Sequence, residues 1–505
     1  MLSHSRTDAE VSNTPRIDAT ALLAIAVPCL ALVFWNTWTH YSYWLDELWS
    51  IALASQSWAE LLSGGILHDV HPPLYPLILK IWVGVFGTAE GATRVLSGMF
   101  AAATLVLLAS CFKTESIAFK AALLGYVATA PAFAYYGQET RSYALILLLA
   151  TAVTLLSVRQ LTDAPSKKHL RYVLMVLLAL THYFGLIYVG LLLLFDFIKA
   201  SGRKERYELV LVGMLTLVWP VLQAYAGGLL SQAGGNFWIE SKGPLTTIKR
   251  FLAGVAPWLG NSAEAFKDSA GMPAAVFAAV FLAAAMVFVG LRMSRERRRQ
   301  CAYLALLIVS FLALLIITDR HTPMSIPRYY IVLLPAVAFV FAFLFDTLFH
   351  LRETPTWRVG AGVGLTAFLA WSAVQSLDGL REKWQPHQNW KVLGAELVSR
   401  GVCDGGCFIV GGFGLHRFYF QPRAAGHHDT RGVITADQAV EKAKTDGVPI
   451  IGLHTARDNF PELRAAYPGW NCYEPRQGWR LSTFVMTPER VAFDRLLPCR
   501  EDSET

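Results

Sequence analysis

Residues 44–49 read Trp-Leu-Asp-Glu-Leu-Trp, and residues 68–76 read His-Asp-Val-His-Pro-Pro-Leu-Tyr-Pro. This stretch follows the first apolar segment of the chain and combines acids, histidines and aromatics. From residue 40 to residue 67 none of the 28 positions is Lys or Arg. Acids and aromatics at the end of an apolar span often form only an interfacial turn with aromatic anchors. The other interpretation is a catalytic loop at a membrane surface, and the rest of the chain favours it.

The composition is that of a polytopic α-helical membrane protein. Of the 505 residues 54% are apolar and only 16% are charged, and long apolar runs recur along the chain. The segment before Ala19 is long and mixed in charge, so we expect the first span to be an anchor and not a cleaved signal. We expect eleven transmembrane helices, near 19–39, 95–112, 121–137, 142–158, 171–183, 185–199, 208–226, 271–291, 301–318, 329–349 and 359–377.

Residues 74–87 form a further apolar run, either a twelfth span or an interfacial helix. Fourteen residues are short for a hydrocarbon core about 30 Å thick, and prolines precede the run. If the run does not cross, the loops on the N-terminal side hold 19 Lys and Arg in 64 residues, against 9 in about 115 opposite. The positive-inside rule then places the N-terminus in the cytoplasm and the C-terminal region outside. If 74–87 crosses and 171–199 is one helix, the downstream topology is the same, but four basic residues between 159 and 171 lie outside.

The last part of the chain, residues 378–505, has a different character. It is polar and carries 16 basic and 16 acidic side chains, so the net charge of +7 belongs to the membrane part and favours anionic lipid over nucleic acid as a partner. Short apolar runs alternate with helical patterns, which predicts a small α/β domain. The apolar runs are 407–410, 448–453 and 483–486, and the helical patterns are 389–400 and 436–445. We therefore expect a cytoplasmic N-terminus over 1–18, a transmembrane domain over 19–377 and an exported domain over 378–505.

Four of the seven cysteines, Cys403, Cys407, Cys472 and Cys499, lie in this last domain. An even number of cysteines in an exported domain permits two disulfide bonds, and the sequence leaves their pairing open. A zinc site is the alternative, although the Cys-x3-Cys pair at 403 and 407 lacks a second close pair.

Ionisable side chains recur in the outer loops that follow the first one. Glu139, Arg141 and Tyr143 lie in a short loop between two apolar spans, and Arg328 and Tyr329 stand where a later span begins. Ionisable groups at this depth are costly, so they indicate function. Under the eleven-span topology all of them lie on the side of the first outer loop. Carboxylates, histidines and arginines at one membrane face suit a sugar on a lipid-borne phosphate, since a carboxylate takes the acceptor's proton while Arg or a metal steadies the departing phosphate.

Five motifs follow one another along the chain in a characteristic order. They are Asp46-Glu47 after the first span, His71-Pro-Pro-Leu-Tyr, Gln138-Glu-x-Arg-x-Tyr-Ala-Leu, Thr181-His-Tyr-Phe and Pro327-Arg-Tyr. Together they resemble the GT-C membrane glycosyltransferases of glycosyltransferase family 39. This family includes protein O-mannosyltransferases and the bacterial aminoarabinose and galacturonic-acid transferases acting on lipid A. The resemblance covers about residues 20–350 and is densest in 41–145.

The resemblance implies a GT-C fold whose first outer loop, residues 41–93, is catalytic and carries interfacial helices. It implies inverting transfer from a polyprenyl-phosphate sugar to lipid A, a glycan or a protein of the envelope, with Asp46 as general base. The catalytic candidates are Asp46, Glu47 and Glu139, and the candidates for binding the donor and its phosphate are His71, Arg141, Tyr143, His182, Arg328 and Tyr329. Many relatives have an Asp where this chain has Glu139. Some use a divalent cation, which His68, Asp69 and His71 could hold, although no spacing requires it.

The expected location is the inner (plasma) membrane, with the C-terminal domain in the periplasm or its equivalent. The expected partners are the polyprenyl-phosphate sugar, membrane lipid and a glycolipid, glycan or protein acceptor, without nucleic acid. Two other functions remain open. A transporter or flippase for a lipid-linked glycan would more often show repeated halves with broken midplane helices, and the sequence shows no internal repeat. An envelope glycan ligase or polymerase would consume a polyprenyl-diphosphate oligosaccharide instead of a monophosphate sugar.

Overall fold

The chain divides into two compact units, which comprise residues 1–37, 58–78 and 93–380, and residues 38–57, 79–92 and 381–505. The expected span 271–291, the ends of 19–39 and the helical pattern 436–445 lie largely or wholly outside the described residues. The computed structural model describes residues 26–34, 42–69, 71–110, 115–162, 167–226, 239, 243–256, 287–384, 390–404, 407–410, 419, 447, 449–452, 469–475, 484–494 and 496–499.

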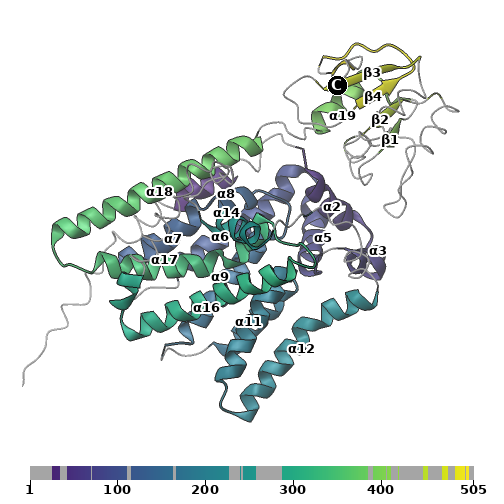
Figure 1. The fold of residues 1–505 in the computed structure, drawn as a ribbon. Helices are drawn as coiled ribbons and strands as arrows, with labels where there is room; N and C mark the ends of the chain where they lie inside the picture. The colour runs from purple at the N-terminus through teal and green to yellow at the C-terminus, as the bar shows by residue number, and fades with distance from the viewer. Residues whose placement is uncertain are drawn as a thin grey trace, which may run out of the picture. The chain divides into compact units, whose positions relative to one another are not determined.

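The first unit is helical (Figure 1). Three of its helices, α5, α6 and α18, have one end in the second unit. Its labelled elements are α3 (Trp58–Glu60), η2 (Leu61–Gly65), α4 (Ile66–His68), α5 (Leu74–Phe86), α6 (Glu90–Ser110), α7 (Ile117–Thr129), α8 (Pro131–Tyr136), α9 (Tyr143–Arg159), α10 (Lys168–Ala179), α11 (Tyr183–Lys199), α12 (Arg203–Tyr225), α14 (Pro244–Val255), α16 (Arg295–Thr318), η4 (Pro327–Leu333), α17 (Leu334–Phe349) and α18 (Pro355–Trp384).

Helix α17 packs against α7, α9 and α16 near the centre of this unit. Phe119 of α7 lies with its ring centroid 5.1 Å from that of Phe343 in α17. Two local features set the start and the end of α7. The hydroxyl of Ser116 accepts the N–H of Phe119 at 3.0 Å and caps α7. The same helix ends at Thr129 because Pro131 cannot continue it and instead begins α8.

Five described helices are long and apolar enough to cross a membrane, which makes this an integral membrane protein. They cover Glu90–Ser110, Arg203–Tyr225, Arg295–Thr318, Pro327–Phe349 and Pro355–Arg381. The other expected spans are helical where they are described but are shorter, so the number eleven is not confirmed. The alternative of one helix over 171–199 is wrong, because α10 and α11 are separate. Helix α5 has 13 residues, about 20 Å of helix, and is of nearly the same length as α7 and α10, so its interfacial position remains a prediction.

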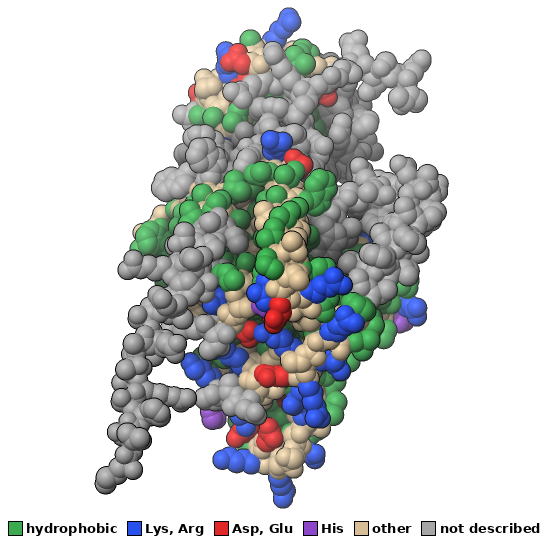
Figure 2. Space-filling model, turned by 90° about the vertical axis from the view of Figure 1, so that its left-hand side faces the viewer, with side chains coloured by type: hydrophobic (Ala, Val, Ile, Leu, Met, Phe, Trp, Pro, Cys, Tyr) green, Lys and Arg blue, Asp and Glu red, His purple; other side chains and the backbone are tan. Residues whose placement is uncertain are grey.

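Exposed basic side chains gather at the starts of α12 and α16. They are Arg203, Lys204, Arg206, Arg295, Arg298 and Arg299. Both helices continue as apolar segments with large exposed hydrophobic side chains, such as Met214 and Val309. Figure 2 shows one face of the molecule, on which hydrophobic side chains lie beside a region of Lys and Arg mixed with Asp and Glu. A charged start followed by an apolar body is the pattern of helices that enter a bilayer from a basic interface.

The second unit combines two helices with a five-stranded sheet. The helices are α2 (Leu45–Ser55) and α19 (Trp390–Ser399), and the strands are β1 (Phe408–Val410), β2 (Ile450–Gly452), β3 (Asn471–Pro475), β4 (Phe484–Thr487) and β5 (Leu496–Pro498). The strand order is β1-β2-β4-β3-β5, with β1 parallel to β2 and the other pairs antiparallel. Ile451 pairs with Val485, and both are fully buried in a core with Leu393 and Leu397 of α19.

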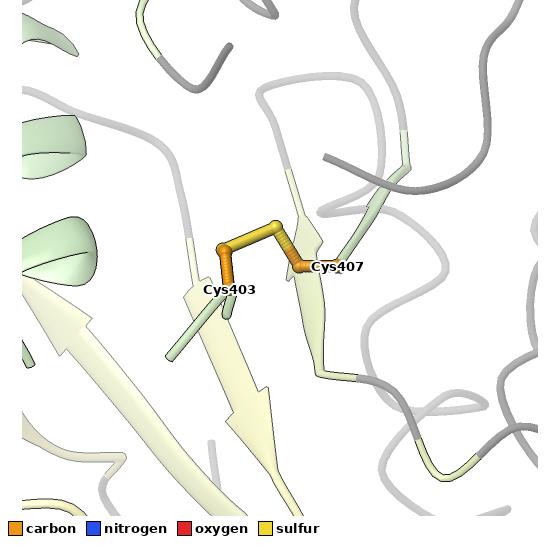
Figure 3. The surroundings of a disulfide bond; sticks show 2 residues. All are labelled: Cys403 and Cys407. Carbon is orange, nitrogen blue, oxygen red and sulfur yellow. A yellow bond between two sulfur atoms is a disulfide. The ribbon is translucent and has the colours of Figure 1, made fainter. Parts of the chain in front are cut away.

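Three of these strands and α19 fall on the segments expected from sequence, so the combination of helix and strands near the C-terminus is confirmed. Strands β3 and β5 were not expected, because neither carries a continuous apolar run. The four cysteines form two disulfide bonds, which supports that interpretation over a zinc site. Cys403 is bonded to Cys407 with the Cα atoms 5.0 Å apart (Figure 3). Cys472 of β3 is bonded to Cys499 with the Cα atoms 5.3 Å apart, which fastens the end of β5 to β3.

Candidate active site

Polar and aromatic side chains from three turns and a 3-10 helix meet in the first unit. His71 lies between α4 and α5, Arg141 between α8 and α9, and His182 between α10 and α11. The ring centroids of His71 and His182 are 5.4 Å apart, and those of His182 and Tyr329 of η4 are 4.9 Å apart. We call this group the His–Arg cluster; its members are His71, Arg141, Tyr143, His182, Arg328 and Tyr329. All six donor-binding candidates from the sequence thus lie together.

His71 is fixed on both sides of its ring. Its Nε2 lies 3.1 Å from Nη2 of Arg141, and its Nδ1 lies 3.8 Å from Oδ2 of Asp69. Because a guanidinium can only donate, Nε2 of His71 accepts this hydrogen bond and the ring proton is assigned to Nδ1, toward the carboxylate. The Asp69 side chain is buried next to this Nδ1–H group of His71.

His182 presents a hydrogen-bond donor to the cluster. Its Nδ1 accepts the N–H of Phe184 at 3.1 Å and so caps α11, which places the proton of the neutral ring on Nε2. Nε2 is buried and has no hydrogen-bond partner among the described residues. Burial lowers the pKa of His182 well below its usual value, and the positive charges of Arg141 and Arg328 lower it further. His182 is therefore a neutral donor at physiological pH.

Two arginines approach the ring of Tyr143. The guanidinium carbon of Arg141 is 5.9 Å from the ring centroid, and that of Arg328 is 6.0 Å from it. Tyr143 itself is fully buried at the start of α9 and lies 6.5 Å, centroid to centroid, from Tyr329. Two guanidiniums, one imidazole donor and aromatic walls form a group suited to an anion attached to an apolar or sugar-bearing molecule.

The turn that carries Glu139 and Arg141 is tied to α6. The backbone carbonyl of Glu139 accepts the hydroxyl of Ser97, and the hydroxyls of Thr140 and Thr93 lie 2.8 Å apart. The side chain of Glu139 is 1% exposed. This carboxylate therefore faces the protein interior, and two hydrogen bonds to α6 fix the backbone on which Arg141 stands.

Hydrogen bonds to Asp319 fix the segment that precedes Arg328. One carboxylate oxygen of Asp319 accepts the N–H groups of Met324 and Ser325 at 3.0 and 3.2 Å, and the other accepts the hydroxyl of Thr247 at 2.7 Å. Helix α14 also approaches η4 closely at Gly254, where an added Cβ would lie 2.4 Å from the carbonyl oxygen of Pro327. These contacts fix the backbone on which Arg328 stands.

Asp46 and Glu47 lie in the second unit, in the first turn of α2. Glu47 is buried, and its Oε2 accepts the backbone N–H of Trp44 at 3.3 Å, which is the role of an acid that stabilises a helix start. Asp46 is only half-buried. Of the two adjacent acids, Asp46 is therefore the more accessible to a substrate.

The backbone before α2 is bonded to the C-terminal part of the same unit. The hydroxyl of Tyr419 accepts the N–H of Tyr43 at 2.5 Å and donates to Oε1 of Glu90 at 3.1 Å. Ser42 accepts the N–H of Trp390 at 3.0 Å. Burial and the negative charge of Glu90 raise the pKa of the Tyr419 hydroxyl, so it remains protonated and able to donate. These contacts hold the start of the catalytic-loop candidate.

The residues suggested for a metal do not assemble a coordination site. Among the described residues, no three His, Cys, Asp or Glu side chains are arranged to hold a metal ion. Nδ1 of His68 lies 2.8 Å from the carbonyl oxygen of Gly64, within its own helical segment. The ring of His71 instead lies between Asp69 and Arg141, as described above.

Several residues of this region were not singled out in the sequence. Tyr183 donates its hydroxyl to Oε1 of Gln223, and Nε2 of Gln223 donates to the carbonyl oxygen of Asp69. For Gln223 the sequence did carry a signal, which is a polar residue within an apolar helix. Glu90 and Tyr419, which are far apart in sequence and surrounded by ordinary residues, gave no such signal.

No family model and no curated protein sequence matches the chain. Solved structures do match it. ArnT from Cupriavidus metallidurans in the apo state is 14% identical with a TM-score of 0.57, over 92% of this chain and 98% of ArnT. The chain has the fold of ArnT. The GT-C fold that the motifs led us to expect is thereby confirmed.

Two further structures belong to the same comparison. ArnT from the same organism bound to undecaprenyl phosphate is 13% identical over the same shares of both chains, with a TM-score of 0.58. The oligosaccharyltransferase of Archaeoglobus fulgidus is 11% identical over 95% of this chain and 75% of its own length, with a TM-score of 0.49. At these identities the likeness to ArnT establishes the fold, and the chemistry has to be argued from this chain's own residues.

Proposed function

We propose that this protein is a membrane glycosyltransferase that takes a sugar from a polyprenyl-phosphate donor and transfers it, with inversion, to an acceptor of the cell envelope. The observation that carries the proposal is the His–Arg cluster, in which two guanidiniums and the ring of His182, with its buried Nε2–H, lie near the buried ring of Tyr143. That combination of donors matches the non-bridging oxygens of a phosphate. The ArnT structure bound to undecaprenyl phosphate supports the choice of lipid.

The reaction explains why fixed cations are needed. In a sugar phosphodiester the phosphate carries one negative charge. When the bond between the anomeric carbon and the phosphate oxygen breaks, the electron pair stays on that oxygen, and polyprenyl phosphate leaves with additional negative charge. Arg141 and Arg328, held in place before the reaction, would stabilise this developing charge more than they stabilise the ground state.

The acceptor half of the reaction needs a base. An acceptor hydroxyl becomes an effective nucleophile when its proton passes to a carboxylate as its oxygen bonds to the anomeric carbon. We assign this role to Asp46, following the family resemblance. Its half-buried position and the helix-start role of Glu47 support Asp46 over its neighbour. We assign Glu139 a supporting role: it helps to fix the turn that carries Arg141, and its carboxylate offsets part of the positive charge there. A divalent cation is not part of the proposed mechanism.

The proposal includes a location. The protein would lie in the inner membrane with its N-terminus in the cytoplasm, and the first outer loop and C-terminal domain would lie on the exported side. The excess of Lys and Arg in the loops on the N-terminal side supports this orientation. The two disulfide bonds near the C-terminus support it independently, because such bonds persist in oxidising compartments.

The test has two parts. Purified protein in lipid nanodiscs should bind undecaprenyl phosphate and should not bind undecaprenol, which lacks the phosphate. Envelope glycolipids and glycoproteins from cells with and without the gene should differ, by mass spectrometry, by the mass of one sugar residue on a specific acceptor. Equal binding of both lipids would refute the phosphate site. A difference of a whole oligosaccharide would identify a glycan ligase instead.

A further inference from the structure

Helix α12 contributes one buried polar side chain that reaches the turn before His71. Gln223 is fully buried near the end of this helix. Its Nε2 donates to the carbonyl oxygen of Asp69, two residues before His71. Its Oε1 accepts the hydroxyl of Tyr183, the residue directly after His182. One amide thus bonds next to both histidines of the His–Arg cluster.

In these two contacts the amide nitrogen of Gln223 is the donor and the amide oxygen is the acceptor, and the reverse arrangement is not possible. A backbone carbonyl must receive a donor and a phenol hydroxyl here donates, so the site needs one donor and one acceptor on the same side chain. A second link between the same turns is the backbone bond from the N–H of Leu74 to the carbonyl of Leu180, at 2.9 Å. The Gln223 contacts and this bond together set the separation of the turns that carry His71 and His182.

We propose that Gln223 is a positioning residue of the donor site: it holds the segments of His71 and His182 at the separation at which Arg141, oriented by His71, and the Nε2–H of His182 both meet the donor's phosphate. The inference rests on the proposed function, since it assigns a role to Gln223 only if the cluster binds phosphate. Gln223 acts through other residues and does not contact the ligand. Small displacements of aligned groups can cost up to roughly 100-fold in rate or affinity, which sets the expected size of the effect.

Exchange of Gln223 for two different residues separates positioning from simple packing. Gln223→Leu fills a similar volume but makes neither hydrogen bond. Gln223→Glu keeps the shape, and its behaviour depends on pH. When protonated, the introduced carboxyl can donate to the Asp69 carbonyl and accept from Tyr183, as the amide does. When ionised, it can only accept, and it places a negative charge next to the carbonyl and the carboxylate of Asp69.

The titratable groups next to this position are Tyr183 and Asp69, with His71 and Arg141 beyond them. These groups are present in the wild type as well, so each variant is compared with wild type at the same pH. The matched control is Thr216→Val. Thr216 is buried on the same helix, but among the residues that the structure describes its hydroxyl bonds only to the carbonyl of Gly213 within α12, at 2.7 Å.

The experiment measures the affinity of nanodisc-embedded protein for undecaprenyl phosphate at pH 5.5 and pH 8.5. We expect Gln223→Leu to bind about 10- to 100-fold more weakly at both pH values and Thr216→Val to bind as wild type does. Gln223→Glu should approach wild-type affinity at pH 5.5 and fall toward the value of Gln223→Leu at pH 8.5. Because this comparison is made within one variant, a folding defect that is the same at both pH values cannot imitate it.

The outcomes distinguish the two proposals. If wild type binds the lipid and Arg328→Ala does not, but both Gln223 variants bind as wild type at either pH, the positioning role is wrong and the proposed function stands. If Gln223→Glu is equally weak at both pH values while Thr216→Val is normal, positioning by hydrogen bonds is also wrong. If wild type fails to bind undecaprenyl phosphate, the proposed function fails and the role of Gln223 with it.

Discussion

Nε2 of His71 lies 3.1 Å from Nη2 of Arg141 and so accepts a hydrogen bond from a cation that stands 70 residues further along the chain. This contact joins the turn after α4 to the turn before α9. It orients the guanidinium of Arg141, which is the donor of this hydrogen bond. In the proposed function this pair forms one half of the phosphate site, and Arg328 with His182 forms the other half.

The first prediction concerns Arg328. Arg328→Lys should lower transfer and the affinity for undecaprenyl phosphate by about tenfold or more, because the loss of a two-pronged, charge-assisted contact costs about 1.5–3 kcal/mol. Protein abundance should not change. Arg320→Lys, on an exposed arginine of the same loop, is the control and should behave as wild type. Unaltered lipid affinity in Arg328→Lys would show that Arg328 is only an interfacial anchor.

The second prediction concerns the two acids of α2. Asp46→Asn keeps the size of the side chain but cannot accept a proton, and it should lower transfer by roughly 10²–10⁴-fold with lipid binding retained. Glu47→Gln keeps an oxygen that accepts the N–H of Trp44, so it should be much milder. Transfer rates with a radiolabelled sugar donor decide the matter. Wild-type turnover in Asp46→Asn together with an inactive Glu47→Gln would move the base to residue 47.

The third prediction follows from the pKa of His182, which the fold lowers below the value of 6.5 expected for an unperturbed ring. Between that lowered pKa and 6.5 the unfolded chain binds more protons than the folded protein does. Stability should therefore rise with pH in this window and be lost as the pH falls below about 6.5. The melting temperature of the purified protein at pH 7.5 and pH 5.0 measures this loss. In His182→Asn, which can still cap α11 but does not titrate, the loss should be smaller; an equal loss in both proteins would mean that His182 is not the group responsible.

The fourth prediction is topological. Starting from a protein in which Cys29, Cys111 and Cys301 are replaced by Ser, His68→Cys and Arg320→Cys should both react with a membrane-impermeant thiol reagent added to spheroplasts. Arg298→Cys should react only after permeabilisation. All three positions are exposed on the protein surface. Labelling of residue 68 without residue 320 would mean that α5 crosses the membrane.

Periodicity and composition were sufficient to predict most of the helices. The apolar runs near 95–112, 142–158 and 301–318 correspond to α6, α9 and α16, because a helix in lipid must satisfy its own backbone and must be apolar over most of its length. The number of crossings could not be predicted with the same security. Several helices, such as α10 with 12 residues, are too short for hydropathy alone to decide whether they span.

The residues of the His–Arg cluster could also be predicted, but the residues that hold them in place could not. The cluster residues are ionisable or aromatic groups beside apolar spans, and such groups are conspicuous in sequence. Gln223 and Asp319 act through hydrogen bonds to backbone groups of distant segments, and a sequence does not reveal which backbone group lies nearby. The inclusion of residues 42–57 in the unit formed with residues 381–505 was unforeseen for the same reason.

The bonds from Tyr419 and Trp390 to residues 42 and 43 bear on how such proteins can be recombined. Tyr419 also packs on two hydrophobic cores, one with Tyr43 and Leu48 and one with Leu393 and Leu397. The C-terminal region is therefore not an interchangeable module. A hybrid that receives residues 381–505 from another transferase would bring foreign side chains against its own α2 and lose the bonds that precede Asp46. Residues 42–57 and 79–92 have to be exchanged together with it for the hybrid to remain active.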